Sequence, residues 1–262
     1  MLALKKHKLN AWFGSASLRD ADNNIQIVNI AREVSTRNIN RGGGGNRFGR
    51  FRQPVYRDVL KLTIEFTLYE FSDIEARESA IEAANAWARD DGYLEISPKP
   101  GRRIRVQCSQ RAEIKDARNH KETFKLVFET DEVPFWEDTQ PAEYTFSGTT
   151  GAATVRIPGT RACAPADVTI TPSAGTLTSL TLALGETAMA FSGLSIAAGA
   201  SLILRHDEDG RLVIENSSGA SLYARRDGAS DDELTAEAGN AAIGFTANVS
   251  CAARFQVRGR YR

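Results

Sequence analysis

The segment Asp58-Val-Leu-Lys-Leu-Thr-Ile-Glu-Phe-Thr-Leu-Tyr-Glu-Phe71 indicates the fold class of this 262-residue chain. Apolar and polar residues alternate along it, and the apolar set is Leu60, Leu62, Ile64, Phe66 and Leu68. Successive side chains of a strand point to opposite faces of a sheet, so a period of two predicts a long strand with one buried face.

The same alternation recurs elsewhere in the first half of the chain, at residues 25–30, 104–108 and 124–128. Each of these segments is short enough to be one strand. The first half is therefore predicted to consist mainly of antiparallel strands.

One helix is predicted among these strands. Ser72 and Glu75 have the spacing of a capping box, and Gly92 stands beyond the expected end. Apolar residues recur between them at helical spacing, at Ile74, Ile81, Ala84, Trp87 and Ala88. We expect this apolar stripe to pack on the sheet, and we assign Trp87 to packing rather than to a ligand platform.

The composition changes after Trp136, where Gly, Ala, Thr and Ser become dominant and charged residues become sparse. We place the domain boundary near residues 138–148, which gives domains at 1–140 and 141–262. The second part contains many short apolar stretches separated by turn signals, at 155–157, 168–170, 180–184, 202–204, 212–214, 245–249 and 255–257. Many short strands without a helical pattern predict a β-sandwich, so the whole chain is expected to be mainly β.

The stretch from Arg41 to Pro54 has no periodicity and no acidic residue. It is predicted to be a long arm or hairpin tip, and its candidate interface residues are Arg41, Gly43, Arg47, Phe48, Arg50, Phe51 and Arg52. Arginines interleaved with phenylalanines could bind single-stranded nucleic acid. We favour an arm that orders against a neighbouring subunit, since Lys plus Arg equals Asp plus Glu at 33 each and no global field attracts nucleic acid.

Motifs that would indicate catalysis or cofactor binding are missing. The three histidines lack a nucleophile context, and the glycines at 42–45 are not followed by the Lys-Ser/Thr pair of a phosphate-binding loop. The acidic stretch from His206 to Gly210 is interpreted as a hairpin turn, and Asp231 to Glu233 as a solvated face. We therefore predict no enzyme, no cofactor and no metal.

Cysteine usage and hydropathy bear on the compartment. Cys108, Cys163 and Cys251 are widely separated, which indicates synthesis in a reducing compartment. The first residues make a poor signal peptide, and no stretch has the roughly 18 apolar residues of a membrane-spanning helix. A soluble protein is expected.

With this layout the chain resembles the distal tail proteins of long-tailed bacteriophages (siphophages). The resemblance rests on the strand-helix-strand order with its Arg/Gly arm, on Phe124-Lys-Leu-Val-Phe-Glu-Thr-Asp-Glu-Val-Pro-Phe-Trp-Glu137, on the glycine-rich second part, and on the end, Phe255-Gln-Val-Arg-Gly-Arg-Tyr-Arg262. It implies an N-terminal domain that forms a hexameric ring and a C-terminal galectin-like β-sandwich.

The resemblance also implies a biological setting. The protein would be a hub in the virion of a phage or prophage, at the tail tip, made in the cytoplasm of the host bacterium. Its partners would be copies of itself, the tail tube protein, the tape-measure protein, the tail-tip protein and receptor-binding or baseplate proteins. DNA would be only cargo passing through the lumen, and no membrane would be bound.

An alternative is a carbohydrate-binding module or host-surface adhesin that uses the C-terminal sandwich. The second domain lacks tryptophan and the His-x-Asn-Pro-Arg motif of true galectins. A scaffold role is therefore favoured over a lectin role.

Overall fold

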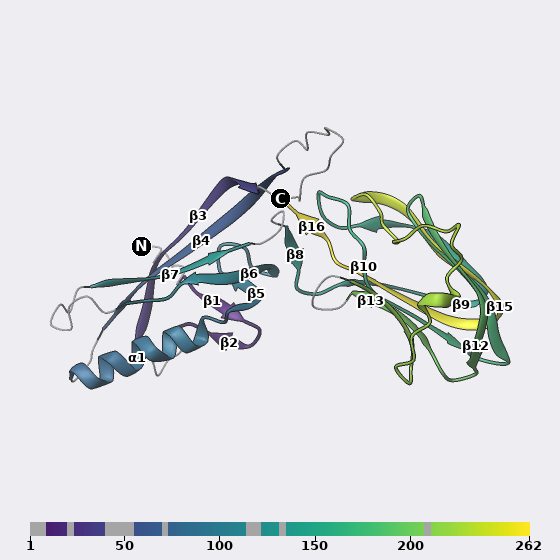
Figure 1. The fold of residues 1–262 in the computed structure, drawn as a ribbon, viewed down its shortest axis with the longest axis horizontal. Helices are drawn as coiled ribbons and strands as arrows, with labels where there is room; N and C mark the ends of the chain where they lie inside the picture. The colour runs from purple at the N-terminus through teal and green to yellow at the C-terminus, as the bar shows by residue number, and fades with distance from the viewer. Residues whose placement is uncertain are drawn as a thin grey trace, which may run out of the picture. The chain divides into compact units, whose positions relative to one another are not determined.

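The computed structural model describes residues 9–19, 24–39, 55–69, 73–113, 122–130, 135–206 and 211–262, with side chains except at 35–39 and 55–58. The chain divides into two compact units, Met1–Trp136 and Glu137–Arg262. Strands dominate both units (Figure 1), so the predicted mainly β fold class is confirmed.

The first unit is built on one antiparallel sheet. Its strands are β1 (Ala11–Phe13), β2 (Ala16–Ser17), β3 (Ile25–Ile39), β4 (Val55–Leu68), β5 (Asp91–Ile96), β6 (Arg102–Gln110) and β7 (Thr123–Glu129). They lie in the order β2-β1-β5-β6-β7-β4-β3. The strand predicted at 58–71 is β4, and its alternating apolar side chains from Leu60 to Leu68 are all buried.

Helix α1 (Ile74–Trp87) packs on this sheet through Ala80, Ile81 and Ala84. The predicted capping box on Ser72 is wrong, because the Asp73 side chain caps the helix and accepts a hydrogen bond from the Ala76 N–H at 2.8 Å. A short carboxylate serves as well as a serine hydroxyl at this position. Gly92 does not end the helix either; it lies in β5.

Trp87 has the packing role assigned to it from sequence. Its ring centroid lies 4.9 Å from that of Phe13 and 6.2 Å from that of Phe128. Its indole Nε1–H donates to the carbonyl of Ala16 at 2.9 Å. The tryptophan therefore joins α1 to the sheet through contacts with β1, β2 and β7.

The second unit is a β-sandwich. Its elements are β9 (Ala142–Ile157), β10 (Pro165–Pro172), β11 (Thr176–Leu184), β12 (Thr187–Ala197), β13 (Leu202–His206), β14 (Leu212–Asn216), η1 (Tyr223–Arg225) and β15 (Gly239–Val257). Two short strands, β8 (Trp136–Asp138) and β16 (Arg260–Tyr261), pair with each other. The hairpin predicted around 206–210 is confirmed at its base, where His206 pairs with Leu212; residues 207–210 lie outside the described ranges.

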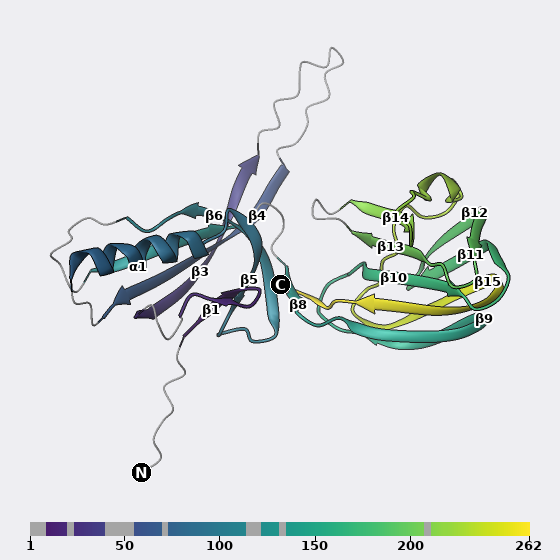
Figure 2. The ribbon, with the colours of Figure 1, turned by 90° about the horizontal axis from the view of Figure 1, so that it is seen from below.

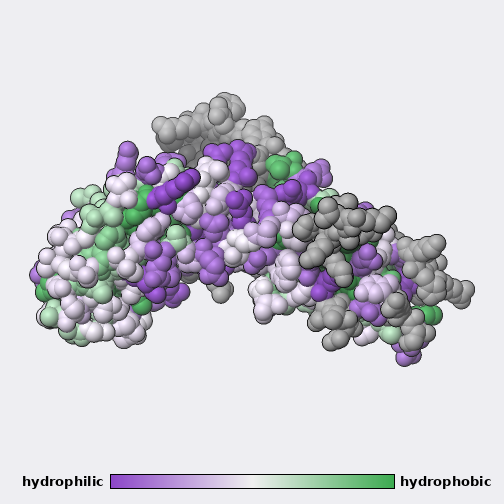
Figure 3. Space-filling model, turned by 180° about the vertical axis from the view of Figure 1, so that it is seen from behind, coloured by the Kyte–Doolittle hydropathy of each residue, from purple (hydrophilic) through white to green (hydrophobic). Residues whose placement is uncertain are grey.

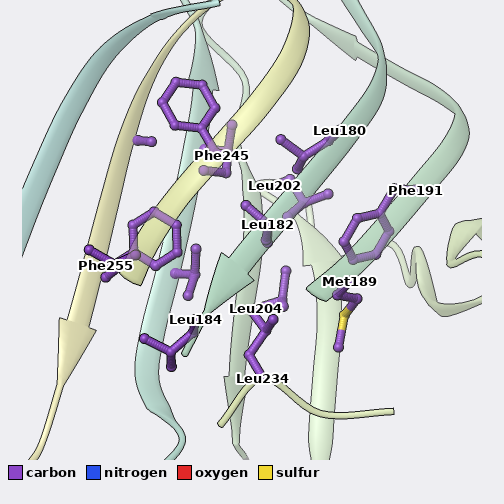
Figure 4. Close-up of a cluster of buried hydrophobic side chains, with 14 of the residues drawn as sticks. Leu180, Leu182, Leu184, Met189, Phe191, Leu202, Leu204, Leu234, Phe245 and Phe255 are labelled. Carbon is purple, nitrogen blue, oxygen red and sulfur yellow. The ribbon is translucent and has the colours of Figure 1, made fainter. Parts of the chain in front are cut away.

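The long strand β15 joins the two layers. Residues 243–247 of β15 pair with β11, residues 251–257 pair with β10, and β9 follows almost the whole strand. The sequence predicts two strands here, at 245–249 and 255–257, which is wrong because one continuous strand covers both (Figure 2). A cluster of buried side chains fills the space between the layers, with Leu182, Met189, Phe245 and Phe255 among its members (Figure 4).

Candidate assembly interface

The predicted arm has a described base. Its candidate residues Arg41, Gly43, Arg47, Phe48, Arg50, Phe51 and Arg52 lie outside the described residues. The strands on either side of it are described: β3 and β4 pair antiparallel from Ile25 opposite Leu68 to Ile39 opposite Val55. The arm therefore continues from the end of a long two-stranded ribbon.

The ribbon formed by β3 and β4 extends beyond the other strands of its sheet (Figure 2). β7 pairs with β4 only from Lys61 to Thr67. At the end of this pairing Thr130 bonds to Leu60 twice, through its backbone N–H and through its hydroxyl oxygen, both at 3.1 Å. Past Leu60 no other described strand accompanies β3 and β4, and a two-stranded ribbon is marginally stable by itself.

The ribbon carries apolar side chains that the described chain leaves exposed. Val34 lies opposite Leu60, so both point to the same face of the sheet. Leu60 is 5% exposed, whereas Val34 is 64% exposed. Val28, at the β-bulge between Ile27 and Asn29, is 45% exposed. The core face of the sheet thus continues onto a part of β3 that nothing described covers.

The outer edge of β3 is also open. β3 is the last strand of its sheet, and no described segment pairs with its outer side. Unpaired N–H and C=O groups along an edge strand favour pairing with another chain. The edge, the exposed valines and the arm base together form the candidate assembly interface.

Two edges in the second unit are covered by the unit's own chain. At β12, the backbone N–H groups of Asp227 and Asp231 donate to the carbonyls of Ala190 and Ala188, at 2.8 and 3.1 Å. At β14, the Leu222 N–H donates to Ile214 at 2.8 Å. Loops of the second unit therefore cover these two strand edges, whereas no described segment covers the outer edge of β3 in the first unit.

The acidic patch predicted at Asp231 to Glu233 is exposed, as expected, and it also holds this coverage in place. Asp231 accepts the Ala188 N–H at 2.7 Å, and Asp232 pairs with Arg226 at 2.7 Å. The acidic residues of this loop therefore have a structural role on the β12 edge.

The polar side chains of the first-unit sheet form cross-strand charge pairs. Lys125 Nζ lies 2.9 Å from Glu65, and Arg105 lies 2.7 Å from Asp91. The hydrogen bonds to Lys125 and Asn29 lower the pKa of Glu65, and the hydrogen bond to Arg105 lowers the pKa of Asp91. Each of these two pairs joins neighbouring strands, so the charge on one strand is compensated by the opposite charge on the next.

Reactive groups are few in the described part of the chain. No group of three His, Cys, Asp or Glu residues could hold a metal ion there, and no described helix is long and apolar enough to cross a membrane. Cys163 is buried, and this burial raises the pKa of its thiol to about 11. That thiol is protonated at neutral pH, which makes it a poor nucleophile.

Comparison with known proteins shows the fold. No family model matches the chain, and no curated protein matches it. The crystal structure of Dit from phage SPP1, described as a paradigm of the hub adsorption apparatus in phages that infect Gram-positive bacteria, matches with a TM-score of 0.65 at 12% identity. This match covers 97% of this chain and 99% of that one. A chain of the phage p2 baseplate in its activated conformation matches with a TM-score of 0.49 at 9% identity, over 95% and 97% of the two chains. The chain thus has the fold of SPP1 Dit from end to end.

Proposed function

We propose that this chain is a non-enzymatic structural subunit of the tail tip of a long-tailed phage or prophage. There it forms a ring-shaped hub that joins the tail tube to the tail-tip or baseplate and host-adsorption apparatus. The observation that carries this proposal is the full-length fold shared with SPP1 Dit, a hub protein by its description.

The open interface of the first unit supports assembly into a closed ring. A ring of identical subunits needs two different complementary surfaces on each subunit. The β3 edge with its exposed Val34 provides one of them, and the arm at 41–53 reaches the neighbour. The proposed ring is a hexamer, as in the resemblance described above.

The hub's neighbours follow from its place in the tail. They are the tail tube protein, the tape-measure protein, the tail-tip protein and receptor-binding or baseplate proteins. The protein belongs to the virion after synthesis in the host cytoplasm, and DNA passes through the lumen as cargo.

The ring is tested by measuring the mass of the purified full-length protein by light scattering over a concentration series, with negative-stain electron microscopy of the same samples. We expect six copies of the 28.6 kDa chain and ring-shaped particles with a central hole. A monomer at every concentration, which also fails to bind purified tail tube protein, would contradict the proposal.

A matched pair of variants tests the interface. Val34→Asp places a charge on the uncovered core face and should shift the protein from hexamer to monomer. Ile74→Asp changes another exposed apolar residue of the same unit, at the start of α1, where an acidic residue suits the helix dipole. It should leave the hexamer intact.

A further inference from the structure

The uncovered part of β3 carries a positive charge beside its exposed valine. Arg32 lies opposite Leu62, which is fully buried, so the Arg32 side chain points to the core face of the sheet. It stands between Ile30 and Val34 on that face and is exposed. No described residue forms an ion pair with Arg32. The candidate assembly interface therefore combines an apolar side chain with an uncompensated cation.

A second cation joins Arg32 from a distant part of the chain. Lys99 lies in the turn between β5 and β6, and its Nζ is 4.6 Å from the centroid of the Trp136 ring. The pKa of Lys99 is lowered, first by burial and then by the positive charges of Arg32 and Arg102. Two arginines therefore lie close enough to Lys99 to repel it. We call Arg32, Lys99 and Arg102 the basic cluster.

Helix α1 carries negative charge on the face turned away from the sheet. Glu75, Glu78 and Glu82 are exposed and lie within about 60° of one another around the helix axis. The one cation in the sequence of this helix is Arg77, which is buried and paired with Glu122. None of the three glutamates forms an ion pair with a described residue. We call these three residues the acidic face.

The acidic face is unfavourable for the helix by itself. Glu78 is three residues from Glu75 and four from Glu82, and like charges at these spacings destabilise a helix. Glu75 lies in the first turn, where the helix dipole favours an acidic residue, but this effect does not reach Glu82. Cations supplied from outside would remove the repulsion, so this face is suited to a basic partner.

The two surfaces lie apart on the first unit. The first turns of α1 approach β7, where Arg77 lies 5.5 Å from the ring centroid of Phe124, and Phe124 pairs with Phe66. Arg32 pairs with Leu62, which is four residues, or about 14 Å, from Phe66 toward the arm. Figure 1 shows α1 along the lower side of this unit and β3 along its upper side. One subunit can therefore use the two surfaces on two different neighbours.

Other acidic residues around the first-unit sheet are already paired. Glu65, Asp90 and Asp91 each lie within 3 Å of a lysine or arginine nitrogen. In Figure 3 the outer part of the second unit, at the left of the view, is mostly white and pale green rather than strongly hydrophilic. In the described part of the first unit, the acidic face of α1 is thus the best match for the basic cluster.

We propose that in the ring the basic cluster of each copy binds the acidic face of α1 in the next copy. This inference rests on the proposed ring and names the two complementary surfaces that a head-to-tail ring needs. A two-fold contact through either surface would oppose like charges, so the complementary signs favour ring closure. The arm has the same sign as the basic cluster, since residues 41–53 include four arginines and no acidic residue.

Charge reversal tests this contact in the full-length protein, by light scattering over a concentration series. Glu78→Lys combined with Glu82→Lys should raise the concentration at which half of the protein is assembled by at least about tenfold. Arg32→Glu combined with Lys99→Glu should do the same. Mixed in equal amounts, the two double variants alternate around a hexamer with opposite charges at every contact, so the mixture should regain the wild-type value. Recovery on mixing also shows that both variants are folded.

A matched pair at one position tests the sign of the charge. Ile74 is exposed and lies four residues before Glu78 on α1. Ile74→Lys should weaken assembly, whereas Ile74→Asp adds a carboxylate to this end of the helix and should not. Both variants lose the same apolar side chain, so their difference reports the charge. Glu186→Arg and Arg161→Glu reverse exposed charges in the second unit and should assemble as the wild type does.

The outcomes separate this contact from the ring itself. A hexamer that neither double variant weakens would overturn the contact and leave the ring. Weakening by the cluster variant alone, or loss of DNA binding by that variant with assembly unchanged, would give the basic cluster a different partner and also overturn the contact. A wild type that stays monomeric at every concentration and does not bind tail tube protein would contradict the ring, and the contact with it.

Discussion

Arg77 is an arginine on the buried face of α1, with 5% of its surface exposed. Its guanidinium lies 3.1 Å from the Glu122 carboxylate and 5.5 Å from the ring centroid of Phe124. The pair links the first turns of α1 to the beginning of β7. A buried charge that loses its partner keeps its desolvation cost, so the whole arrangement depends on both residues.

Arg77→Ala should therefore lower the free energy of unfolding of the first unit by about 3–5 kcal/mol. Arg105→Ala removes an exposed arginine–carboxylate pair from the same unit, and it should lower it by less than about 1 kcal/mol. Urea unfolding followed by circular dichroism measures both. Equal losses for the two variants would show that the burial of Arg77 is energetically unimportant.

The cysteines should differ in reactivity in the folded protein. Burial raises the pKa of the Cys163 thiol to about 11 and shields its sulfur, whereas Cys108 is only partly buried. Iodoacetamide at pH 8 reacts with accessible thiolates, so it should modify Cys108 well before Cys163. Mass spectrometry of peptides over a time course measures the order, and denatured protein, in which all three should react alike, is the control.

At the scale of elements, the sequence predicted the features that follow from the spacing of apolar residues along a strand or a helix. The β4 strand, the helix and the packing of Trp87 could be read from residue periodicity. The helix cap was misassigned by one residue because Ser72 and Asp73 are both good caps, and only the backbone geometry distinguishes them. The extent of β9 and β15 could not be read, since their Gly, Ala, Ser and Thr segments carry little hydropathy signal and become strands through pairing.

The candidate interface had a mixed outcome for a similar reason. The arm was predicted from its composition, and it stays a prediction because its residues lie outside the described ones. The open edge of β3 had no sequence signal, because which strand ends a sheet depends on pairing between distant segments.

Gly159 should be required for the close packing of the last residues of the second unit, around Arg260, against the loop after β9. Its φ of +111° is unfavourable for other residues, and an added Cβ would lie 2.5 Å from the Arg260 carbonyl oxygen. Gly159→Ala should therefore lower the free energy of unfolding by roughly 2–4 kcal/mol. Gly199, with φ +83° and open space around it, is the matched control, and Gly199→Ala should cost about 1 kcal/mol. Thermal unfolding of both compares them, and equal shifts would show that the contact with Arg260 is unimportant.

At the scale of the whole molecule, the second unit has the features of an independently folding domain. It has its own buried cluster. Its last residues also return to its first: Arg260 Nε lies 3.2 Å from Glu137 Oε1, and the Tyr261 hydroxyl donates to Asp138 at 3.1 Å. These contacts close the unit on itself, so its stability should not depend on residues before Glu137.

The fragment 137–262 should accordingly fold alone and unfold in one cooperative transition, which circular dichroism in urea measures. The fragment lacks β3 and the arm, so light scattering of the folded fragment should show no hexamer at any concentration. A hexameric fragment would instead move the ring contact out of the first unit, because the second unit would then supply both surfaces that ring closure needs.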